Sequence, residues 1–514
     1  MSGNPFGGPG GASATDLVNA ALGRARQGDI AGASALVERA MQMEPRNPAV
    51  LTGRAIIYRV EGRMREAVLA CDQAIAIEPR MAGAWLERGH VLANGGSPVL
   101  ARESFRKAAK LAPQLADAHA NVAALAARDG DMKEARKAAW KALKLDPANL
   151  LAANAMASVH LSDGEPQRAL DLLAPLVDRF GPGDTRATAL SLIGRAHEKL
   201  SSHAKAYEHF AKSKQDFADY TAGIRQGRLS NTDFIEAIHE GFGKLEPGCW
   251  TSPLEPLDDR PSPIFLLGYP RSGTTLVENI LASIEGVAAL EERPTLIETE
   301  KHYLLGDRER IVSGLGEFAQ AGADELVQQR DDFWHKVFAS GVPEDSAHYV
   351  DMDPLKGSRL PFIARLLPHA RIVIMRRDPR DVVWSCFRTD FAIANSTLEY
   401  TSLESTARHY DALMRMTEAA QAVLPLACHE LRYEALVADF ETATKELCAL
   451  AGLPWSEDVR AFAQTADRRG VATASAGQVR KGLYDGSRQW EPYAEYLEPV
   501  LPILAPWIEK FGYS

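Results

Sequence analysis

The sequence predicts an all-α repeat solenoid followed by an α/β domain built on a parallel sheet. A 34-residue period runs through roughly the first 220 residues, and a period of this length indicates stacked helical repeats. Beyond residue 260, two short apolar runs each lead into a polar loop and then a helical pattern, as the strands of a parallel sheet do. A chain of 514 residues is also too long for one hydrophobic core.

Proline, glycine and alanine recur at the same spacing in the N-terminal part of the chain, and three registers that share one period predict a repeat. The glycine ends one helix in a tight turn. The alanines let the two helices of a unit approach closely, and the proline closes the unit because it cannot continue a helix. The series are Pro45, Pro79, Pro113 and Pro147; Gly28, Gly62, Gly96, Gly130 and Gly164; Ala33, Ala67, Ala101, Ala135 and Ala169; and Ala40, Ala74, Ala108 and Ala142.

This pattern resembles tetratricopeptide repeats over residues 15–220, with a degenerate last unit, ALSLIGRAHEKLSSHAKAYEHF. The resemblance implies a right-handed solenoid with a concave face. Two interpretations of the array stay open. In one, the concave face binds the acceptor substrate or a protein partner. In the other, the array packs on the rest of the chain or forms a homodimer.

Composition marks the remaining segments. Residues 1–14 are rich in glycine and have no basic region followed by an apolar core, so we expect a flexible tail and no signal peptide. Residues 221–260 become polar and proline-rich after a helical stretch, which predicts a connecting helix and linker. Residues 261–514 are expected to form the second domain.

Charge and cysteine content exclude several classes of function. The net charge of −10 argues against general binding to nucleic acid or anionic membranes. No apolar run is long enough for a membrane span. The five cysteines are scattered without a CxxC pair, so we expect reduced thiols in a cytoplasmic protein and neither a disulfide framework nor a zinc site.

A glycine-bearing loop follows the first apolar run of the second domain. The apolar run at residues 264–267 is followed by Gly268, and Gly273 precedes a helical pattern. A strand, a loop and a helix in this order direct backbone N–H groups and the positive helix end at a phosphate. The glycine spacing is that of a nucleotide-triphosphate loop, but Thr274 replaces its lysine. Arg271 instead offers a guanidinium suited to phosphate or sulfate oxygens.

The string PRSGTTL in this loop resembles the 5′-phosphosulfate loop of sulfotransferases, especially tyrosylprotein sulfotransferases and bacterial repeat-linked relatives. The resemblance implies a P-loop-like sulfotransferase domain that moves a sulfuryl group from 3′-phosphoadenosine-5′-phosphosulfate, as cosubstrate, to an acceptor hydroxyl without a metal. The resemblance assigns the 5′-phosphosulfate to Arg271, Ser272, Gly273, Thr274 and Thr275.

A second buried strand is predicted at residues 371–375, directly before RRDPRD and a helix. Charge at the carboxyl end of an apolar strand is typical of ligand sites in open α/β sheets. Arg377 and Ser385, eight residues apart, resemble the family's 3′-phosphate motif. Arg480 and Lys481 resemble the basic C-terminal segment that reaches the same phosphate, and the RYE triplet at 432–434 is interpreted as structural or close to the adenine.

An acceptor hydroxyl must lose its proton, so the reaction needs a base within hydrogen-bond reach. Glu292 lies 21 residues after Arg271, the separation at which tyrosylprotein sulfotransferases carry a catalytic glutamate. Glu291 is then expected to be a neighbour, and His302 is the rival base by analogy with cytosolic small-molecule sulfotransferases. The acceptor stays open between a peptide tyrosine, a sugar and a lipid hydroxyl.

One position departs from the family pattern. A lysine usually follows the aspartate in a D-K-x-P stretch and stabilises the leaving group, but this chain has Met352 there. Either Lys356, one turn later, supplies that charge, or Arg271 acts alone. The alternatives to an active sulfotransferase are a repeat scaffold on an inactive nucleotide-binding domain and a P-loop kinase, which the missing loop lysine disfavours.

Overall fold

The computed structural model describes residues 12–225, 227–255, 257, 260–469, 475–480 and 482–513. Packing divides the chain into two compact units, one ending at Gly181 and the other beginning at Pro182. Within the described ranges, no helix combines the length and apolar character needed to cross a membrane.

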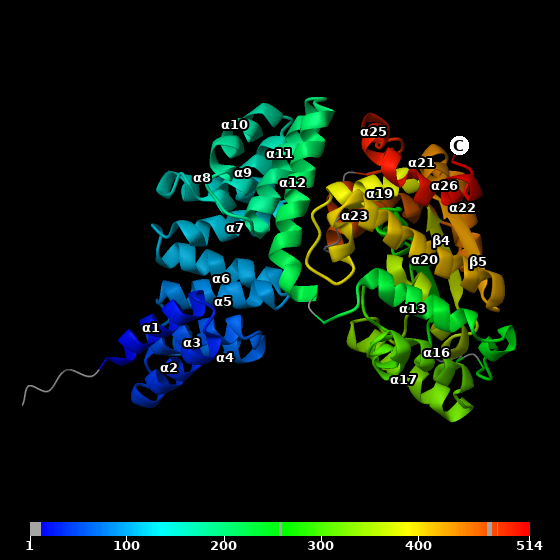
Figure 1. Cartoon of the computed structure of the whole chain (residues 1–514), viewed down its shortest axis with the longest axis horizontal. Coiled ribbons are helices and arrows are strands. Elements are labelled where there is room, and N and C mark those ends of the chain that lie inside the picture. Colours follow the sequence, from blue (N-terminus) through cyan, green and yellow to red (C-terminus); the bar gives the residue numbers. More distant parts are fainter. Residues whose placement is uncertain are drawn as a thin grey trace, which may run out of the picture. The chain divides into compact units, whose positions relative to one another are not determined.

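The first unit consists of paired helices that stack one pair after another along the chain (Figure 1). Each pair is one predicted repeat, so the predicted helical repeat is confirmed. The helices are α1 Ala14–Arg26, α2 Ile30–Met43, α3 Pro48–Val60, α4 Met64–Ile77, α5 Ala82–Asn94, α6 Pro98–Leu111, α7 Ala116–Arg128, α8 Met132–Leu145, α9 Leu150–Ser162 and α10 Pro166–Val177.

The periodic residues occupy the positions that the sequence predicts. The five periodic glycines lie in the turn between the helices of a pair, with φ between 77° and 86°, where a side chain would be strained. The periodic alanines are fully buried where helices meet. Gly89 shows how close the helices come, because a Cβ there would lie 2.4 Å from Cε1 of Phe105.

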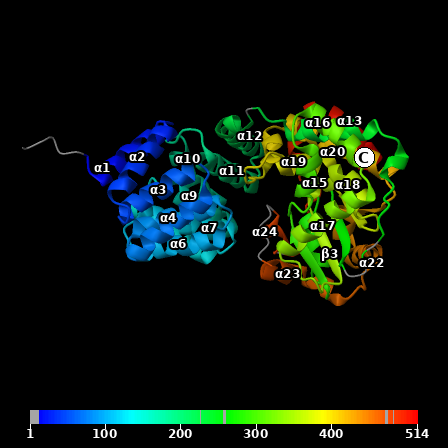
Figure 2. The ribbon, with the colours of Figure 1, turned by 90° about the horizontal axis from the view of Figure 1, so that it is seen from below.

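The second unit surrounds a sheet with helices on both faces. Its helices are α11 Asp184–Lys199, α12 His203–Thr221, α13 Asn231–Gly243, α14 Thr274–Leu281, α15 Ile297–Leu304, α16 Arg308–Gln320, α17 Ala323–Ala339, α18 Leu360–Leu366, α19 Pro379–Arg388, α20 Leu403–Val423, α21 Tyr433–Ala438, α22 Phe440–Ala451, α23 Phe462–Arg469, α24 Ala476–Val479, α25 Ala494–Leu497 and α26 Leu501–Lys510. Figure 2 shows strand β3 (His348–Met352) of this sheet among α17, α22 and α23.

The sheet has five parallel strands in the order β2-β3-β1-β4-β5. They are β1 Ser262–Leu267, β2 Val287–Glu291, β3 His348–Met352, β4 Arg371–Arg376 and β5 Ala427–Arg432. Strand β1 pairs with β3 on one side and β4 on the other, so the strand order changes direction there. In open α/β sheets, ligands bind outside the carboxyl ends of the strands at such a point.

Alternate residues of the central strands enter two separate cores. Phe265 and Leu267 of β1 belong to one, with residues of α13 and α16 to α20. Ile264 and Leu266 belong to the other, with residues of α14, α22 and α23. Burial on both faces is typical of parallel strands, which therefore read as continuous apolar runs.

Helices α11 and α12 pack with the second unit, although the repeat predicted over residues 15–220 includes them. Phe210 of α12 contacts Trp384 of α19 edge to face, with ring centroids 6.0 Å apart. Tyr207 of α12 stacks on Tyr496 at 3.8 Å. By packing, the division lies between Gly181 and Pro182, while the boundary near residue 221 stays a prediction.

Candidate active site

The candidate site lies at the carboxyl ends of the parallel strands, where four polar segments begin. Gly268 follows β1, Glu292 follows β2, Asp353 follows β3 and Arg377 follows β4. Because all the strands run the same way, these segments share one edge of the sheet. The sequence analysis placed candidate site residues in all four segments, with Lys356 as the candidate in the segment after β3.

The loop from Gly268 to Thr275, here called the phosphate loop, has no room for side chains at its two glycines. Gly273 has φ +104°, and a Cβ there would lie 2.8 Å from Cδ2 of Tyr433. At Gly268 a Cβ would lie 2.8 Å from Oγ of Ser272, whose oxygen accepts the N–H of Tyr269. Helix α14 begins at Thr274, so its positive end and its first N–H groups face the loop.

Arg271 crosses from the phosphate loop to two other segments. Its Nε donates to Oγ of Ser385 at 3.0 Å. Its Nη1 donates to Oγ of Ser475 at 2.5 Å, and its Nη2 donates to Oε1 of Gln478 at 2.7 Å. The backbone of Arg271 has φ +72°, an unusual value for a residue with a side chain. Strained backbone of this kind concentrates at ligand sites.

Arg377 lies against the same loop. Its Nη1 donates to the carbonyl oxygen of Arg271 at 2.6 Å and its Nη2 to that of Gly486 at 2.5 Å. The guanidinium carbon lies 4.7 Å from the centre of the Tyr433 ring. Its Nε is buried and has no hydrogen-bond partner among the residues that the structure describes. A buried cationic donor without a partner indicates a site for an anionic ligand.

Between these groups lies a pocket that is open to solvent. Arg271 and Arg377 line it with the aromatic rings of Tyr433 and Tyr484. Burial first, and then the neighbouring guanidiniums of Arg377 and Arg388, lower the pKa of Arg271 to about 10. Two cations and two rings in one pocket suit a ligand that carries phosphate and an aromatic base.

Glu292 stands directly after β2 in a strained turn. Its φ is +45°, and its N–H donates to the carbonyl oxygen of Met352 at 2.8 Å. The side chain is exposed, but the surrounding protein still desolvates it and raises the pKa of its carboxyl to about 7, with contributions from Asp353, Glu291 and Glu278. A carboxyl with a pKa near neutrality that water and substrate can reach is suited to accept a proton.

His302 occupies a different environment. It is exposed on α15, where its ring packs edge-on against Tyr303 and its Nε2 lies 4.0 Å from the carboxylate of Glu325. These neighbours belong to α15 and α17 and not to the phosphate loop. The geometry therefore favours Glu292 over His302 as the base.

Lys356 is buried beneath the site and is not open toward the pocket. Its ammonium donates to the carboxylate of Asp351, to Oγ1 of Thr295 at 3.0 Å and to the carbonyl oxygen of Arg293 at 3.1 Å. An ammonium has three donors, so all are used. The predicted direct catalytic role of Lys356 stays a prediction, and Met352, at the family's lysine position, is fully buried.

The predicted contact of the basic C-terminal segment with the 3′-phosphate stays a prediction. Arg480 pairs with Asp467 at 3.3 Å, and Lys481 lies outside the described residues. Ser475 and Gln478 bind Arg271, although the sequence analysis assigned no role to them. The QVRKG string marked their neighbourhood, but nothing in it indicated a contact with the phosphate loop.

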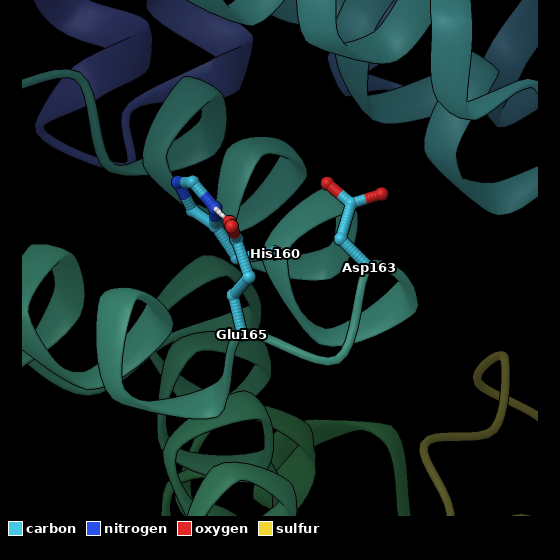
Figure 3. Close-up of side chains that lie close together, drawn as sticks. All are labelled: His160, Asp163 and Glu165. Atoms are coloured by element: carbon cyan, nitrogen blue, oxygen red, sulfur yellow. Dashed lines mark hydrogen bonds and ion pairs between the residues drawn. The ribbon is translucent and has the colours of Figure 1, made fainter.

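A separate cluster, His160, Asp163 and Glu165, has the residue types of a metal site (Figure 3). Nδ1 of His160 lies 3.0 Å from Glu165, and Arg136 pairs with Asp163. Asp129, 34 residues before Asp163, accepts from Arg102 in the same way at 2.9 Å. The ion pair between Arg136 and Asp163 therefore recurs from repeat to repeat and joins successive repeats. We assign no metal to the cluster.

Two family models match the chain. One, described as the sulfotransferase family, covers residues 263–457. The other, described as a tetratricopeptide repeat, covers residues 18–82.

Several proteins are similar in sequence. An uncharacterized protein of Aquifex aeolicus is 27% identical over 345 residues, 64% of this chain and 43% of that protein. Protein-tyrosine sulfotransferase 1 of Danio rerio is 24% identical over 268 residues, 49% of this chain and 72% of that protein. Protein-tyrosine sulfotransferase A of Caenorhabditis elegans is 23% identical, over 50% of this chain and 68% of that protein. The chain thus matches less than half of the Aquifex protein.

Some solved structures are similar to part of the chain. Pseudomonas aeruginosa PilF is 18% identical with a TM-score of 0.35, covering 39% of this chain and 91% of that one. The type IV pilus biogenesis factor PilW is 23% identical with the same TM-score, covering 40% and 93%. The repeat fold itself rests on the helix pairs described above and on the matching family model.

Proposed function

From the match of residues 263–457 to the sulfotransferase family model, with a tetratricopeptide-repeat match at residues 18–82 ahead of it, we propose that the chain transfers a sulfuryl group from 3′-phosphoadenosine-5′-phosphosulfate to an acceptor hydroxyl. The observation that carries the proposal is the convergence of Arg271, Ser385 and Arg377 from two loops at the sheet edge. A donor phosphorylated at two positions needs two such anchors.

The phosphate loop is proposed to hold the 5′-phosphosulfate. The N–H groups at the start of α14 and the hydroxyls of Thr274 and Thr275 are the donors there. Arg271 supplies a positive charge beside them. Sulfuryl transfer, like phosphoryl transfer, depends mainly on positioning and on stabilising the charge that develops on the transferred group and the leaving oxygen.

The 3′-phosphate is proposed to bind Arg377 and Ser385. Supporting this, Nε of Arg377 is buried without a partner among the described residues, and Ser385 is buried and already contacts the other arginine. The ring of Tyr433, which lines the pocket, is a surface for the adenine. Arg480 and Lys481 remain further candidates for this phosphate.

Glu292 is proposed to be the general base. The acceptor oxygen attacks sulfur, the bond between sulfur and the donor's phosphate oxygen breaks, and adenosine 3′,5′-bisphosphate leaves. The acceptor's proton passes to the carboxylate of Glu292. A pKa of about 7 leaves this carboxylate a stronger base than an ordinary glutamate while it is still largely ionised in weakly alkaline solution.

The repeats are proposed to bind the acceptor or a protein that delivers it. Relatives named protein-tyrosine sulfotransferases make a peptide tyrosine the first acceptor to test. A sugar and a lipid hydroxyl are the other two classes.

The test is transfer of radiolabelled sulfate from the donor to a tyrosine-containing peptide, an oligosaccharide and a hydroxylated lipid, each offered separately to the full chain. We expect label in one class, and about ten- to a hundredfold less in that class with Arg377→Ala at the same subsaturating donor concentration. No transfer to any class, with donor binding intact, would instead support the inactive scaffold.

A further inference from the structure

A buried polar cluster lies directly beneath the turn that carries Glu292. It is formed by Asp351 at the end of β3, Lys356 in the following 3-10 helix, and Thr295, which comes three residues after Glu292. All three side chains are at most 3% exposed. Ionised groups this deeply buried are costly unless they are paired and fully hydrogen-bonded.

Every polar side-chain atom of this cluster makes a hydrogen bond, and several of these bonds hold the turn that carries Glu292. Asp351 accepts from Lys356 on one oxygen, and from Oγ1 of Thr295 at 2.6 Å and the hydroxyl of Tyr349 at 3.0 Å on the other. Lys356 also donates hydrogen bonds to Oγ1 of Thr295 and to the carbonyl oxygen of Arg293. Two of these acceptors, Thr295 and Arg293, belong to the turn itself.

The same short segment also holds the phosphate loop. The N–H of Asp353 donates to the carbonyl oxygen of Leu266 at 3.3 Å, and the N–H of Gly268 donates to that of Pro354 at 3.2 Å. On its other side, the carbonyl oxygen of Met352 accepts the N–H of Glu292. Residues 351–356 therefore connect the base to the loop that binds the donor.

We infer that Lys356, Asp351 and Thr295 are positioning residues, which fix the carboxylate of Glu292 relative to the phosphate loop without contacting the substrate. The inference rests on the proposed function. It differs from a direct role of Lys356 on the leaving oxygen, for which the ammonium would have to abandon a buried carboxylate. Small displacements of a reacting group are costly, about a hundredfold for 1 Å.

The sharpest test is Thr295→Val in the full chain, because valine keeps the shape of threonine and no charge changes. A second variant, Asp351→Asn with Lys356→Met, removes both charges together and leaves neither ion buried alone. The matched control is Thr444→Val, which removes a similarly buried hydroxyl in another part of the fold, where its described partners are the carbonyl oxygens of Phe440 and Glu441 and the indole N–H of Trp455.

Three measurements are made on each variant: transfer to a tyrosine-containing peptide and to 4-nitrophenol, Kd of adenosine 3′,5′-bisphosphate, and hydrogen exchange of the Glu292 amide. We expect kcat of Thr295→Val to fall about ten- to a hundredfold, with Kd within about twofold of the starting protein. The hydrogen-exchange rate of the Glu292 amide should rise about tenfold, because the turn opens more often in this variant. Thr444→Val should change none of the three.

Each outcome has one meaning. An unchanged kcat in Thr295→Val overturns the inference. A weakened Kd in Asp351→Asn/Lys356→Met with normal exchange at Glu292 also overturns it, in favour of a direct contact between Lys356 and the donor. If the starting protein transfers nothing, the proposed function fails, and exchange alone decides the inference: faster exchange supports it and unchanged exchange overturns it.

Discussion

Nε of Arg271 lies 3.0 Å from Oγ of Ser385, a hydrogen bond between residues 114 positions apart in the chain. It joins the loop after β1 to the helix after β4, two strands that are neighbours in the sheet. Arg271 also binds Ser475 and Gln478, so one side chain connects three segments of the pocket. In the proposed function, Arg271 binds the donor, so donor binding is expected to be coupled to the C-terminal segment.

Arg377→Ala is expected to weaken binding of adenosine 3′,5′-bisphosphate by about ten- to a hundredfold, because hydrogen bonds to charged groups contribute about 1.5–3 kcal/mol. Binding of adenosine 5′-monophosphate should change much less. Calorimetry with both nucleotides measures the difference. Arg408→Ala, which removes an exposed arginine that pairs with Glu404, is the control. If the variant still prefers the bisphosphate, Arg480 or Lys481 would be assigned to the 3′-phosphate in place of Arg377.

Adenosine 3′,5′-bisphosphate is expected to raise the Tm, and ATP, which lacks the 3′-phosphate, to raise it only weakly. A ligand that binds the native state alone stabilises it by about 2.7 kcal/mol at a hundredfold excess over its Kd. Thermal denaturation of the full chain with each nucleotide at equal concentration provides the measurement. Equal shifts would contradict the paired anchors at Arg271 and Arg377.

The meeting of Arg271, Arg377 and Ser385 was predictable from the sequence because each follows a strand signal. Parallel strands place their carboxyl ends on one edge, so two such loops are brought together whatever the details of packing. The contacts of Ser475 and Gln478 were not predictable, since no strand fixes that segment and it lies about 200 residues from Arg271.

Lys356 shows a second limit. Its place one turn after Met352, the family's lysine position, suggested that it reaches the leaving group, but spacing does not reveal which way an ammonium turns. In the structure, the ammonium of Lys356 is directed toward Asp351, because this buried carboxylate needs a cation and lies within reach. For α11 and α12, apolar residues such as Tyr207 and Phe210 fit a repeat and an interdomain contact equally well, so the sequence pattern left their partner undetermined.

Gly89→Ala is expected to destabilise the repeats by about 1–3 kcal/mol, because its methyl group would overlap the ring of Phe105 where α5 meets α6. Gly83→Ala lies in the same helix with open space around it, so alanine should be neutral there or stabilise by up to about 1 kcal/mol. Urea denaturation of the two variants side by side tests the contrast. Similar effects at both sites would mean that the helices separate more readily than the structure implies.

The pH dependence of kcat should show an acid limb near pH 7. The pKa of Glu292 is raised to about 7, and only the ionised carboxylate accepts a proton, so activity is lost as the pH falls through that value. Glu291→Gln removes one of the neighbouring negative charges that raise this pKa. The acid limb of this variant should therefore lie at lower pH, while its kcat at high pH stays unchanged. An acid limb near the ordinary glutamate pKa of 4.5 would show that water screens the carboxylate fully.

Glu292→Gln tests the base directly. Glutamine keeps the shape of the side chain and still accepts a hydrogen bond, but it takes no proton at neutral pH. The kcat should fall by about 10²–10⁴-fold, the usual contribution of a positioned proton acceptor. Kd of adenosine 3′,5′-bisphosphate should stay unchanged, because the arginines of the pocket, and not Glu292, bind the nucleotide.

The acceptor's own acidity sharpens this test. A phenol with a low pKa has less need of a base than an aliphatic alcohol, so 4-nitrophenol should lose less rate in Glu292→Gln than a serine-containing peptide does. The Glu292→Gln protein should also lack the acid limb near pH 7 that the unsubstituted chain is expected to show. Initial rates with both acceptors across pH 5 to 9, beside calorimetry of the bisphosphate, measure all three effects. Near-normal turnover in Glu292→Gln would remove Glu292 from the mechanism and make His302 the next residue to replace, despite its contacts with Tyr303 and Glu325.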